Sequence, residues 1–145
     1  MEIAVPSKGR AGKVKTQQIL SQCLVYVPEI ESEAYILGGT KNVISVPNSI
    51  KGITQTRNWI LKNSKNKRVV MIDDDVKSCG YFKLYERKAK QKKLTEDEWL
   101  AEFEKLFDIT EGLNYRIWGV STDGALRSVY PYNPFLWKSY ITASC

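Results

Sequence analysis

The segment RVVMIDDD, residues 68–75, constrains the fold more than any other stretch of this chain. In it, a run of apolar residues leads directly into three consecutive aspartates. A strand that is apolar on both faces is typical of a parallel sheet covered by helices on both sides. Ligands of such sheets bind at the carboxyl ends of the strands. The sequence therefore predicts a central parallel strand at residues 68–72, with carboxylates at a ligand-binding edge.

The rest of the chain alternates between extended and helical patterns. Apolar stretches predict strands at residues 2–7, 24–28, 42–47 and 115–120, and EAYIL at 33–37 is a further extended segment. Residues 9–23 are predicted to form a glycine-bearing turn that leads into a helix. Further helices are predicted from Asn48 or Ser49 onwards and over residues 94–114. This alternation predicts an α/β fold with a mostly parallel sheet flanked by helices.

Each predicted helix has apolar residues that are expected to face a core. They are Val14, Ile19 and Leu20 in the first helix, Ile50, Ile53, Ile60 and Leu61 in the second, and Trp99, Leu100, Phe103, Leu106 and Phe107 in the third. In the third helix, Thr95 is the expected N-cap and Glu98 completes a capping box. Gly112 is the expected stop.

Composition limits the chemistry. The chain has 145 residues, enough for one domain over residues 1–145, and no histidine. Ser–His and Cys–His nucleophile pairs and histidine-ligated zinc are therefore excluded. The three cysteines form no CxxC pair, so neither a zinc site nor disulfides are indicated, and Cys23 and Cys79 are expected to be buried thiols. A net charge of +6 favours an anionic partner. The basic run at 86–93 is expected to be a solvated loop.

No membrane association is expected, because the apolar runs are far shorter than the roughly 20 residues that span a bilayer. The segment MEIAVPSKGR has no charged leader followed by an apolar run. No secretory signal is therefore expected, and the cytoplasm is the expected location.

The three aspartates predict a metal site. Because side chains alternate along a strand, Asp73 and Asp75 should share a face while Asp74 points elsewhere. Two carboxylates on one face repel each other unless a cation lies between them. Mg²⁺ and Mn²⁺ commonly accept one or two carboxylates together with waters and substrate phosphates. Two alternatives remain open: a solvated loop or helix cap, and an aspartyl-phosphate site of the phosphoryl-transfer type.

Four segments together resemble a known fold family. IAVPSKGRAGKVKT, YVPEIESEAY, VPNSIKGITQTRNWIL and VVMIDDDV occur in the order of the nucleotide-sugar half of a GT-A-fold glycosyltransferase, which ends in a DxD motif. More narrowly, the set is similar to the TET/JBP-associated glycosyltransferases of phages and some eukaryotes. The resemblance implies a GT-A-like, Rossmann-like fold in a compact or truncated form without C-terminal acceptor elements. For a phage-encoded chain, the location would be the host cytoplasm.

The resemblance also implies roles for individual residues. Asp73 and Asp75 would bind Mn²⁺ or Mg²⁺, with Asp73 also near the ribose. The residues expected to line or approach the nucleotide sugar are Ser7, Lys8, Arg10, Glu29, Arg57 and Asn58. Asp123, in STDGAL, is the candidate catalytic base if the sugar inverts. Five of these residues also have a role without function as an alternative. Arg57 could form a surface ion pair, Lys8 and Arg10 could be solvated turn residues, Glu29 could be a charge at a strand end, and Asp123 could belong to a β-turn.

The function implied is a metal-dependent glycosyltransferase that moves a sugar from a nucleotide sugar, preferably UDP-linked, to a modified base in DNA. Two alternatives remain. The chain could be a non-catalytic nucleic-acid-binding or interaction module on a degenerate GT-A fold. It could also be a nucleotidyltransferase, although PSKGRAGK does not match the glycine-rich first loop of those enzymes.

Overall fold

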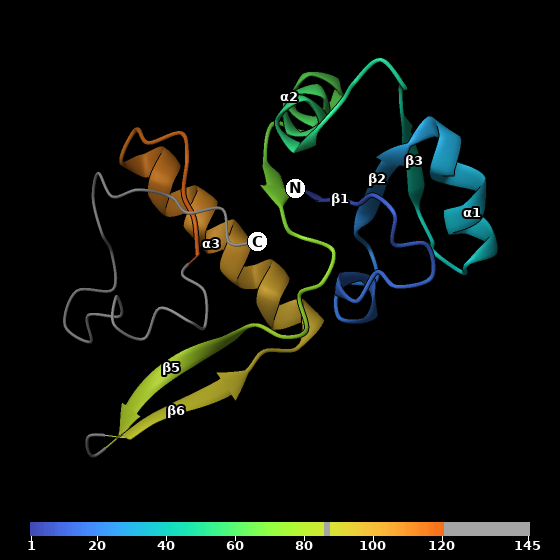
Figure 1. Ribbon diagram of the computed structural model, residues 1–145. Helices are drawn as coiled ribbons and strands as arrows, with labels where there is room; N and C mark the ends of the chain where they lie inside the picture. The colour runs from blue at the N-terminus through green and yellow to red at the C-terminus, as the bar shows by residue number, and fades with distance from the viewer. Residues whose placement is uncertain (86–87, 121–145) are drawn as a thin grey trace.

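The computed structural model describes residues 1–85 and 88–120, with side chains for 1–80 and 93–120. The strands are β1 (Glu2–Pro6), β2 (Leu24–Pro28), β3 (Val43–Val46), β4 (Val69–Met71), β5 (Gly80–Tyr85) and β6 (Lys88–Lys93). The helices are α1 (Ser32–Leu37), α2 (Ile53–Asn63) and α3 (Glu96–Gly112), with short 3₁₀ turns η1 (Thr16–Gln18) and η2 (Glu29–Glu31). Figure 1 shows β5 and β6 as a hairpin that extends away from the main sheet.

An all-parallel sheet organises the described part of the chain. Its four strands lie in the order β3-β2-β1-β4. In the register, Val5 pairs with Val25, Ile3 with Val70, and Tyr26 with Ile44. The predicted α/β fold with a mostly parallel sheet is therefore confirmed, and it is consistent with a compact GT-A-like domain. All four carboxyl ends lie at the same edge of this sheet.

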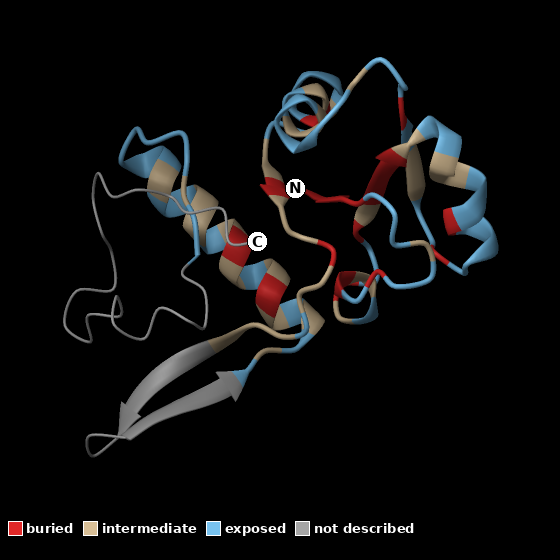
Figure 2. Cartoon of the chain, in the orientation of Figure 1, coloured by how far each residue is buried: buried red, intermediate tan, exposed pale blue. Residues whose placement is uncertain are grey.

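Strand alternation divides the apolar residues between the two faces of the sheet. Ile3, Val5, Val25 and Val27 pack on one face, in a cluster that also holds Trp99 and Phe103 of α3 and Tyr35 of α1. Ala4, Tyr26 and Val46 pack on the other face with Ile60 of α2. Figure 2 shows the buried residues concentrated in β1, in β2 and along one side of α3. Helices thus cover both faces, and the edge of the sheet is left for a ligand.

Helix α3 forms as its sequence predicts. Thr95 caps it: its side chain accepts a hydrogen bond from the Glu98 N–H, and the Glu98 side chain accepts one from the Thr95 N–H. The helix ends at Gly112. Its amphipathic stripe reaches the core through Trp99 and Phe103, both about 5% exposed.

The glycine-bearing turn forms as predicted, and Gly9 and Gly12 have φ of +68° and +70° in it. The helix predicted to follow this turn is wrong, because only the 3₁₀ turn η1 forms there. The N–H groups of Lys15 and Thr16 donate to the carbonyl of Asp74 instead of to the preceding turn. Of the predicted core residues of this segment, Val14 and Leu20 are nevertheless buried and Ile19 is partly buried. Tertiary contacts with the aspartate loop therefore determine this backbone.

Two further local predictions are corrected. The segment EAYIL lies in helix α1, not in an extended segment. Its Tyr35 is buried, while Ile36 and Leu37 are exposed. The prediction failed because so short an apolar run is compatible with either a helix or a strand. Helix α2 begins at Ile53 after Gly52, not at Asn48 or Ser49. Its Ile60 is buried as predicted, but Ile53 and Leu61 are more than half exposed. The buried face of α2 is therefore narrower than its apolar residues indicate.

Three extended or loop predictions also change. β4 is at the edge of the described sheet, paired with β1, because no described strand adds beyond it. Part of the basic run, Lys88–Lys93, is not a loop but pairs with β5. Such a ladder uses backbone N–H and C=O groups, which lysine supplies as well as an apolar residue does. Residues 115–120 form no strand, and Trp118 packs instead against Phe103 and Phe107.

A close contact between glycines positions the loop that follows β1. A Cβ atom added at Gly38 would lie 2.7 Å from the backbone nitrogen of Gly12. Gly38→Ala is therefore expected to lower the free energy of unfolding by about 1–3 kcal/mol through overpacking, measured by urea denaturation. Gly112→Ala is the matched control, since nothing lies within 4 Å of the added methyl group. Equal midpoints for the two variants would contradict the steric explanation.

Candidate functional site

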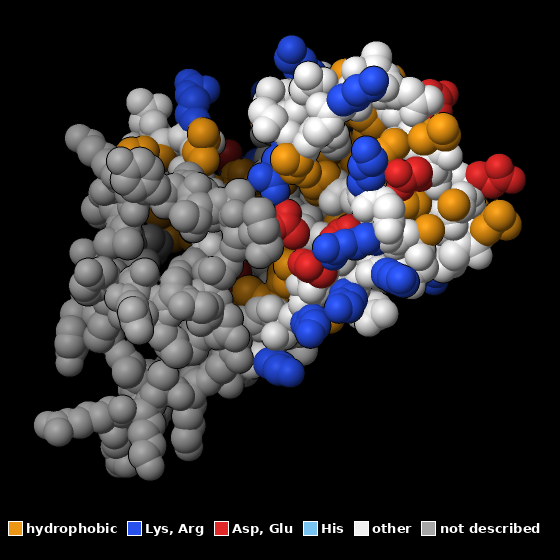
Figure 3. All heavy atoms as spheres, viewed as in Figure 1, with side chains coloured by type: hydrophobic (Ala, Val, Ile, Leu, Met, Phe, Trp, Pro, Cys, Tyr) orange, Lys and Arg blue, Asp and Glu red, His pale blue; other side chains and the backbone are white. Residues whose placement is uncertain are grey.

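A cleft of about 720 Å³ lies at the carboxyl ends of the parallel strands. Pockets of roughly 300–1,000 Å³ at this edge of an α/β sheet commonly hold a nucleotide or cofactor. The lining residues come from the loops after β1, β2, β3 and β4 and from the start of α2; they are Pro6, Ser7, Lys8, Arg10, Tyr26, Pro28, Ile30, Glu31, Asn48, Ile50, Lys51, Gly52, Ile53, Thr56, Arg57, Asp73, Asp74 and Asp75. Figure 3 shows acidic and basic side chains side by side near the middle of the face in view.

All three aspartates have arginine partners. Arg57 Nη2 donates to Asp73 Oδ1 at 2.9 Å. Arg10 Nη1 donates both to Asp74 Oδ1 at 2.8 Å and to Asp75 Oδ2 at 3.0 Å. The hydrogen bond to Asp75, together with the charge of Asp74, raises the pKa of Arg10. In the structure, two guanidinium groups thus offset two of the three negative charges of the carboxylates.

The prediction that Asp73 and Asp75 share a face is wrong. β4 ends at Met71, so strand alternation does not continue into the aspartates, which lie in a turn. Asp74 and Asp75 share Arg10, and Asp73 faces Arg57. Asp74 is 8% exposed and is the most buried of the three. It has a structural role that the sequence pattern did not indicate.

A chain of hydrogen bonds supports Asp74. The Ser7 hydroxyl donates to Asp74 Oδ2, so the contact between Ser7 Oγ and Tyr35 Oη, 2.8 Å long, must use the proton of Tyr35. Tyr35 Oη in turn accepts from the Arg10 N–H at 2.9 Å. Such chains polarise one another in a low-dielectric interior. This network joins the loop after β1, helix α1 and the aspartate turn.

The Thr16 side chain also holds the aspartate turn in place. The Thr16 hydroxyl donates to the carbonyl oxygen of Asp73, and Thr16 Oγ1 accepts from the Val76 N–H at 3.1 Å. Thr16 is fully buried. Because both ends of the turn are bound to one side chain, the carboxylates have a defined position before any ligand arrives.

The cleft brings together most of the predicted site residues. Ser7, Lys8, Arg10, Arg57, Asp73 and Asp75 all line it. Glu29 and Asn58 do not: both are exposed and outside the lining. Glu29 belongs to the turn η2, which directs Glu31 to the cleft instead, and Glu31 accepts from the Gly9 N–H at 2.6 Å. Asp123 lies outside the described residues.

The roles of Tyr35, Thr16 and Glu31 are not evident from the sequence. Each makes its contact across more than twenty positions of the chain. No local signal marks such contacts, although Glu31 and Tyr35 fall within the segment YVPEIESEAY.

The donor set fits a divalent cation in part. Asp73 Oδ2 is buried and accepts no hydrogen bond from the described residues, which leaves one anionic oxygen uncompensated. Asp75 is half-exposed and accessible from the cleft. Within residues 1–80 and 93–120, however, no group of three or more His, Cys, Asp or Glu side chains is arranged to hold a metal ion. The remaining ligands of a cation at Asp73 and Asp75 would come from water or a bound substrate.

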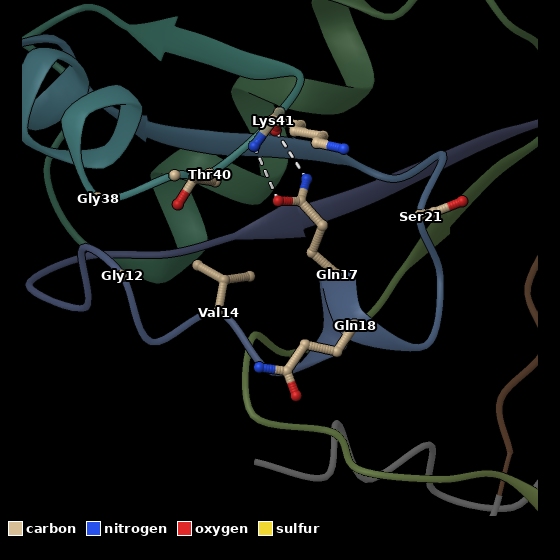
Figure 4. Close-up of a pocket in the computed structure, with 9 residues that line it drawn as sticks. Gly12, Val14, Gln17, Gln18, Ser21, Gly38, Thr40 and Lys41 are labelled. Carbon is tan, nitrogen blue, oxygen red and sulfur yellow. Dashed lines mark hydrogen bonds between the residues drawn. The ribbon is translucent and has the colours of Figure 1, made fainter.

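A smaller pocket of about 270 Å³ lies beside η1 and is a weaker candidate. Figure 4 shows the Gln17 side chain extending across it to the backbone of Lys41. Gln17 Nε2 donates to the Lys41 carbonyl at 2.7 Å, and Gln17 Oε1 accepts from the Lys41 N–H at 2.8 Å. Because these polar groups satisfy each other, the pocket is better explained as scaffold.

Two sequence expectations have structural outcomes outside the cleft. Cys23 is fully buried, and desolvation raises the pKa of its thiol to about 11, as befits an inert core residue. Within the part of the chain that the structure describes, no helix combines the length and apolar character needed to cross a membrane.

Comparison with known proteins gives one match. A family model described as TET-Associated Glycosyltransferase (TAGT) matches residues 1–139. Searches of curated proteins and of solved structures gave no match. The family match covers nearly the whole chain and includes every residue of the cleft.

The hydrogen-bond chain through Tyr35 generates a stability prediction. Tyr35→Phe is expected to lower the free energy of unfolding by about 1–2 kcal/mol, because the Arg10 N–H and Ser7 lose a buried partner. Ser7→Ala breaks the same chain, so the double variant should lose about 1 kcal/mol less than the sum of the single variants. Urea denaturation of all four proteins measures this coupling, and additive losses would contradict it.

Proposed function

The chain belongs to the TET-associated glycosyltransferase family, and on this premise we propose that it transfers a sugar from a nucleotide-sugar donor, preferably a UDP-sugar, to a modified base in DNA. The observation that carries the proposal is the cleft at the carboxyl ends of the strands, where Asp73 and Asp75 lie beside Arg10 and Arg57. This arrangement combines carboxylates that a metal ion can use with cations that a diphosphate can use.

The charges along the cleft support a diphosphate ligand. Arg57 Nε is buried and has no hydrogen-bond partner among the described residues, so a phosphate oxygen that reached it would satisfy an unpaired donor. Lys8 is exposed at the rim. Guanidinium groups match phosphate oxygens in fork geometry, and lysine binds them as a point charge. Ile30 and Ile53 give the cleft an apolar part on which the nucleoside can lie.

Asp73 and Asp75 would hold Mn²⁺ or Mg²⁺. When bound there, the cation would supply Lewis-acid neutralisation of the negative charge on the leaving diphosphate. Arg57 and Lys8 would share this stabilisation electrostatically, because they face the charge that develops in the transition state. Asp74 would keep the turn in place through Ser7 and Arg10.

The proposed reaction is a displacement at the anomeric carbon. A hydroxyl group on the acceptor nucleobase forms the new C–O bond as the bond from the anomeric carbon to the diphosphate oxygen breaks. The proton of that hydroxyl group passes to a general base. For an inverting reaction, Asp123 remains the proposed base. The net charge of +6 supports a polyanionic acceptor such as DNA.

Binding of the donor tests the proposal most directly. Calorimetry with a panel of nucleotide sugars is expected to show binding that depends on Mn²⁺. Asp75→Asn should weaken that binding at least tenfold and leave the thermal midpoint nearly unchanged, because Asp75 is half-exposed. Asp97→Asn, at an exposed position of α3, is the control and should bind normally. Absence of nucleotide-sugar or nucleoside-diphosphate binding in the presence of Mn²⁺ would refute the proposal.

The acceptor requires a separate assay. With a labelled nucleotide sugar, we expect transfer to DNA that contains hydroxymethylated bases and none to unmodified DNA of the same sequence. Strongly salt-dependent DNA binding without donor binding would instead favour the non-catalytic module. Release of pyrophosphate from a nucleoside triphosphate would favour the nucleotidyltransferase.

A further inference from the structure

Arg10 occupies the place where a cation is expected. Its Nη1 atom lies 2.8 Å from Asp74 Oδ1 and 3.0 Å from Asp75 Oδ2, so a single nitrogen bridges two carboxylates. The contact with Asp75 is open to solvent, since the Arg10 and Asp75 side chains are 45% and 44% exposed, whereas the Asp74 side chain is 11% exposed and also accepts the hydrogen bond of Ser7. Exposed ion pairs contribute little to stability and exchange readily. By contrast, Arg57 and Asp73 are 27% and 19% exposed, which marks that pair as the more permanent one.

The backbone that carries Arg10 is held independently of its guanidinium. The Arg10 N–H donates to Tyr35 Oη at 2.9 Å, and the Gly9 N–H donates to Glu31 at 2.6 Å. The side chain can therefore leave the carboxylates while the loop remains in position. Asp74 would still accept the hydrogen bond of Ser7. A change of rotamer is sufficient for the exchange.

A divalent cation and the Arg10 guanidinium cannot both lie against Asp75 without strong repulsion. A cation that binds there must displace Arg10. Because Arg10 lines the cleft, its displaced guanidinium remains at the edge of the space that the donor would occupy. The nearest anion introduced with the cation would be the donor's diphosphate, for which arginine has suitable geometry.

We propose that Arg10 is a positioning residue that exchanges partners: it holds Asp74 and Asp75 when no cation is bound, and it moves to the diphosphate when a divalent cation binds Asp75. This inference rests on the proposed function, because it requires a cation and a diphosphate in the same cleft. The exchange explains why an arginine side chain contacts Asp74 and Asp75. Without such an exchange, that contact would conflict with metal binding. It also makes the two ligands thermodynamically coupled.

The coupling has a definite sign. The cation alone binds weakly, because it must compete with Arg10 for the carboxylates. A nucleoside diphosphate accepts the released guanidinium and so favours cation binding, and by linkage the cation favours the diphosphate to the same degree. Removing Arg10 should therefore tighten binding of the cation alone and reduce the coupling.

The test compares the whole chain with three variants. Arg10→Ala is expected to bind Mn²⁺ alone about fivefold more tightly than the unmodified chain does, as followed by the electron paramagnetic resonance of free Mn²⁺. The factor by which UDP enhances Mn²⁺ binding should fall at least fivefold. Lys13→Ala removes the same charge from the same loop but does not line the cleft, and should change Mn²⁺ affinity less than twofold. Arg10→Lys keeps the charge without the fork and should give an intermediate affinity.

The possible outcomes separate this inference from the proposed function. If Arg10→Ala binds Mn²⁺ no more tightly, or if Lys13→Ala tightens it equally, partner exchange is overturned even when the unmodified chain binds nucleotide sugars. Binding of UDP that is indifferent to Mn²⁺ in the unmodified chain also overturns it. If Arg10→Ala is unfolded by circular dichroism, Arg10→Lys decides: unchanged Mn²⁺ affinity in that variant rejects the exchange. Absence of donor binding altogether rejects both proposals.

Discussion

Neutralisation of three consecutive aspartates is the constraint on which the rest of this structure depends. Asp74 is nearly buried, and a buried carboxylate is costly unless charge and hydrogen bonds compensate it. Arg10 supplies the charge, and Ser7 supplies a hydrogen bond. To deliver both, the loop after β1 must approach the turn after β4. The parallel order of these two strands permits this, because it places their carboxyl ends at the same edge.

The same contacts define the cleft. The loop after β1 is held by Tyr35 of α1 and by the close approach of Gly12 to Gly38, while Thr16 binds the aspartate turn. These tethers fix one wall of the cleft, and α2 brings Arg57 to the other. The candidate site is therefore preorganised by scaffold residues that have no chemical part in the proposed reaction.

The ion pairs of Arg10 and Arg57 with the aspartates affect whether a metal ion can bind there. Carboxylates pinned by basic neighbours are a poor site for an ion unless the neighbours can move. The exposure of Arg10 and Asp75 makes that pair exchangeable, whereas the pair of Arg57 and Asp73 is more buried. Asp73 Oδ2 is buried without a hydrogen-bond partner among the described residues, and the proposed cation would satisfy it. In the proposed function, binding of the cation and binding of the diphosphate would therefore be one coupled event.

Sequence alone determined the α/β class, strands β1 to β4 and the capped helix α3, because apolar periodicity and capping are local signals. The family match agrees with the resemblance from which the roles of site residues were carried over, and six of those residues, Ser7, Lys8, Arg10, Arg57, Asp73 and Asp75, line one cleft. Only the tertiary structure decided that residues 9–23 avoid a helix, that Glu31 replaces Glu29 at the cleft, and that Arg10 joins Asp74 to Asp75. The physical reason is that these outcomes depend on hydrogen bonds and charge pairs between segments far apart in the chain, which no local pattern encodes.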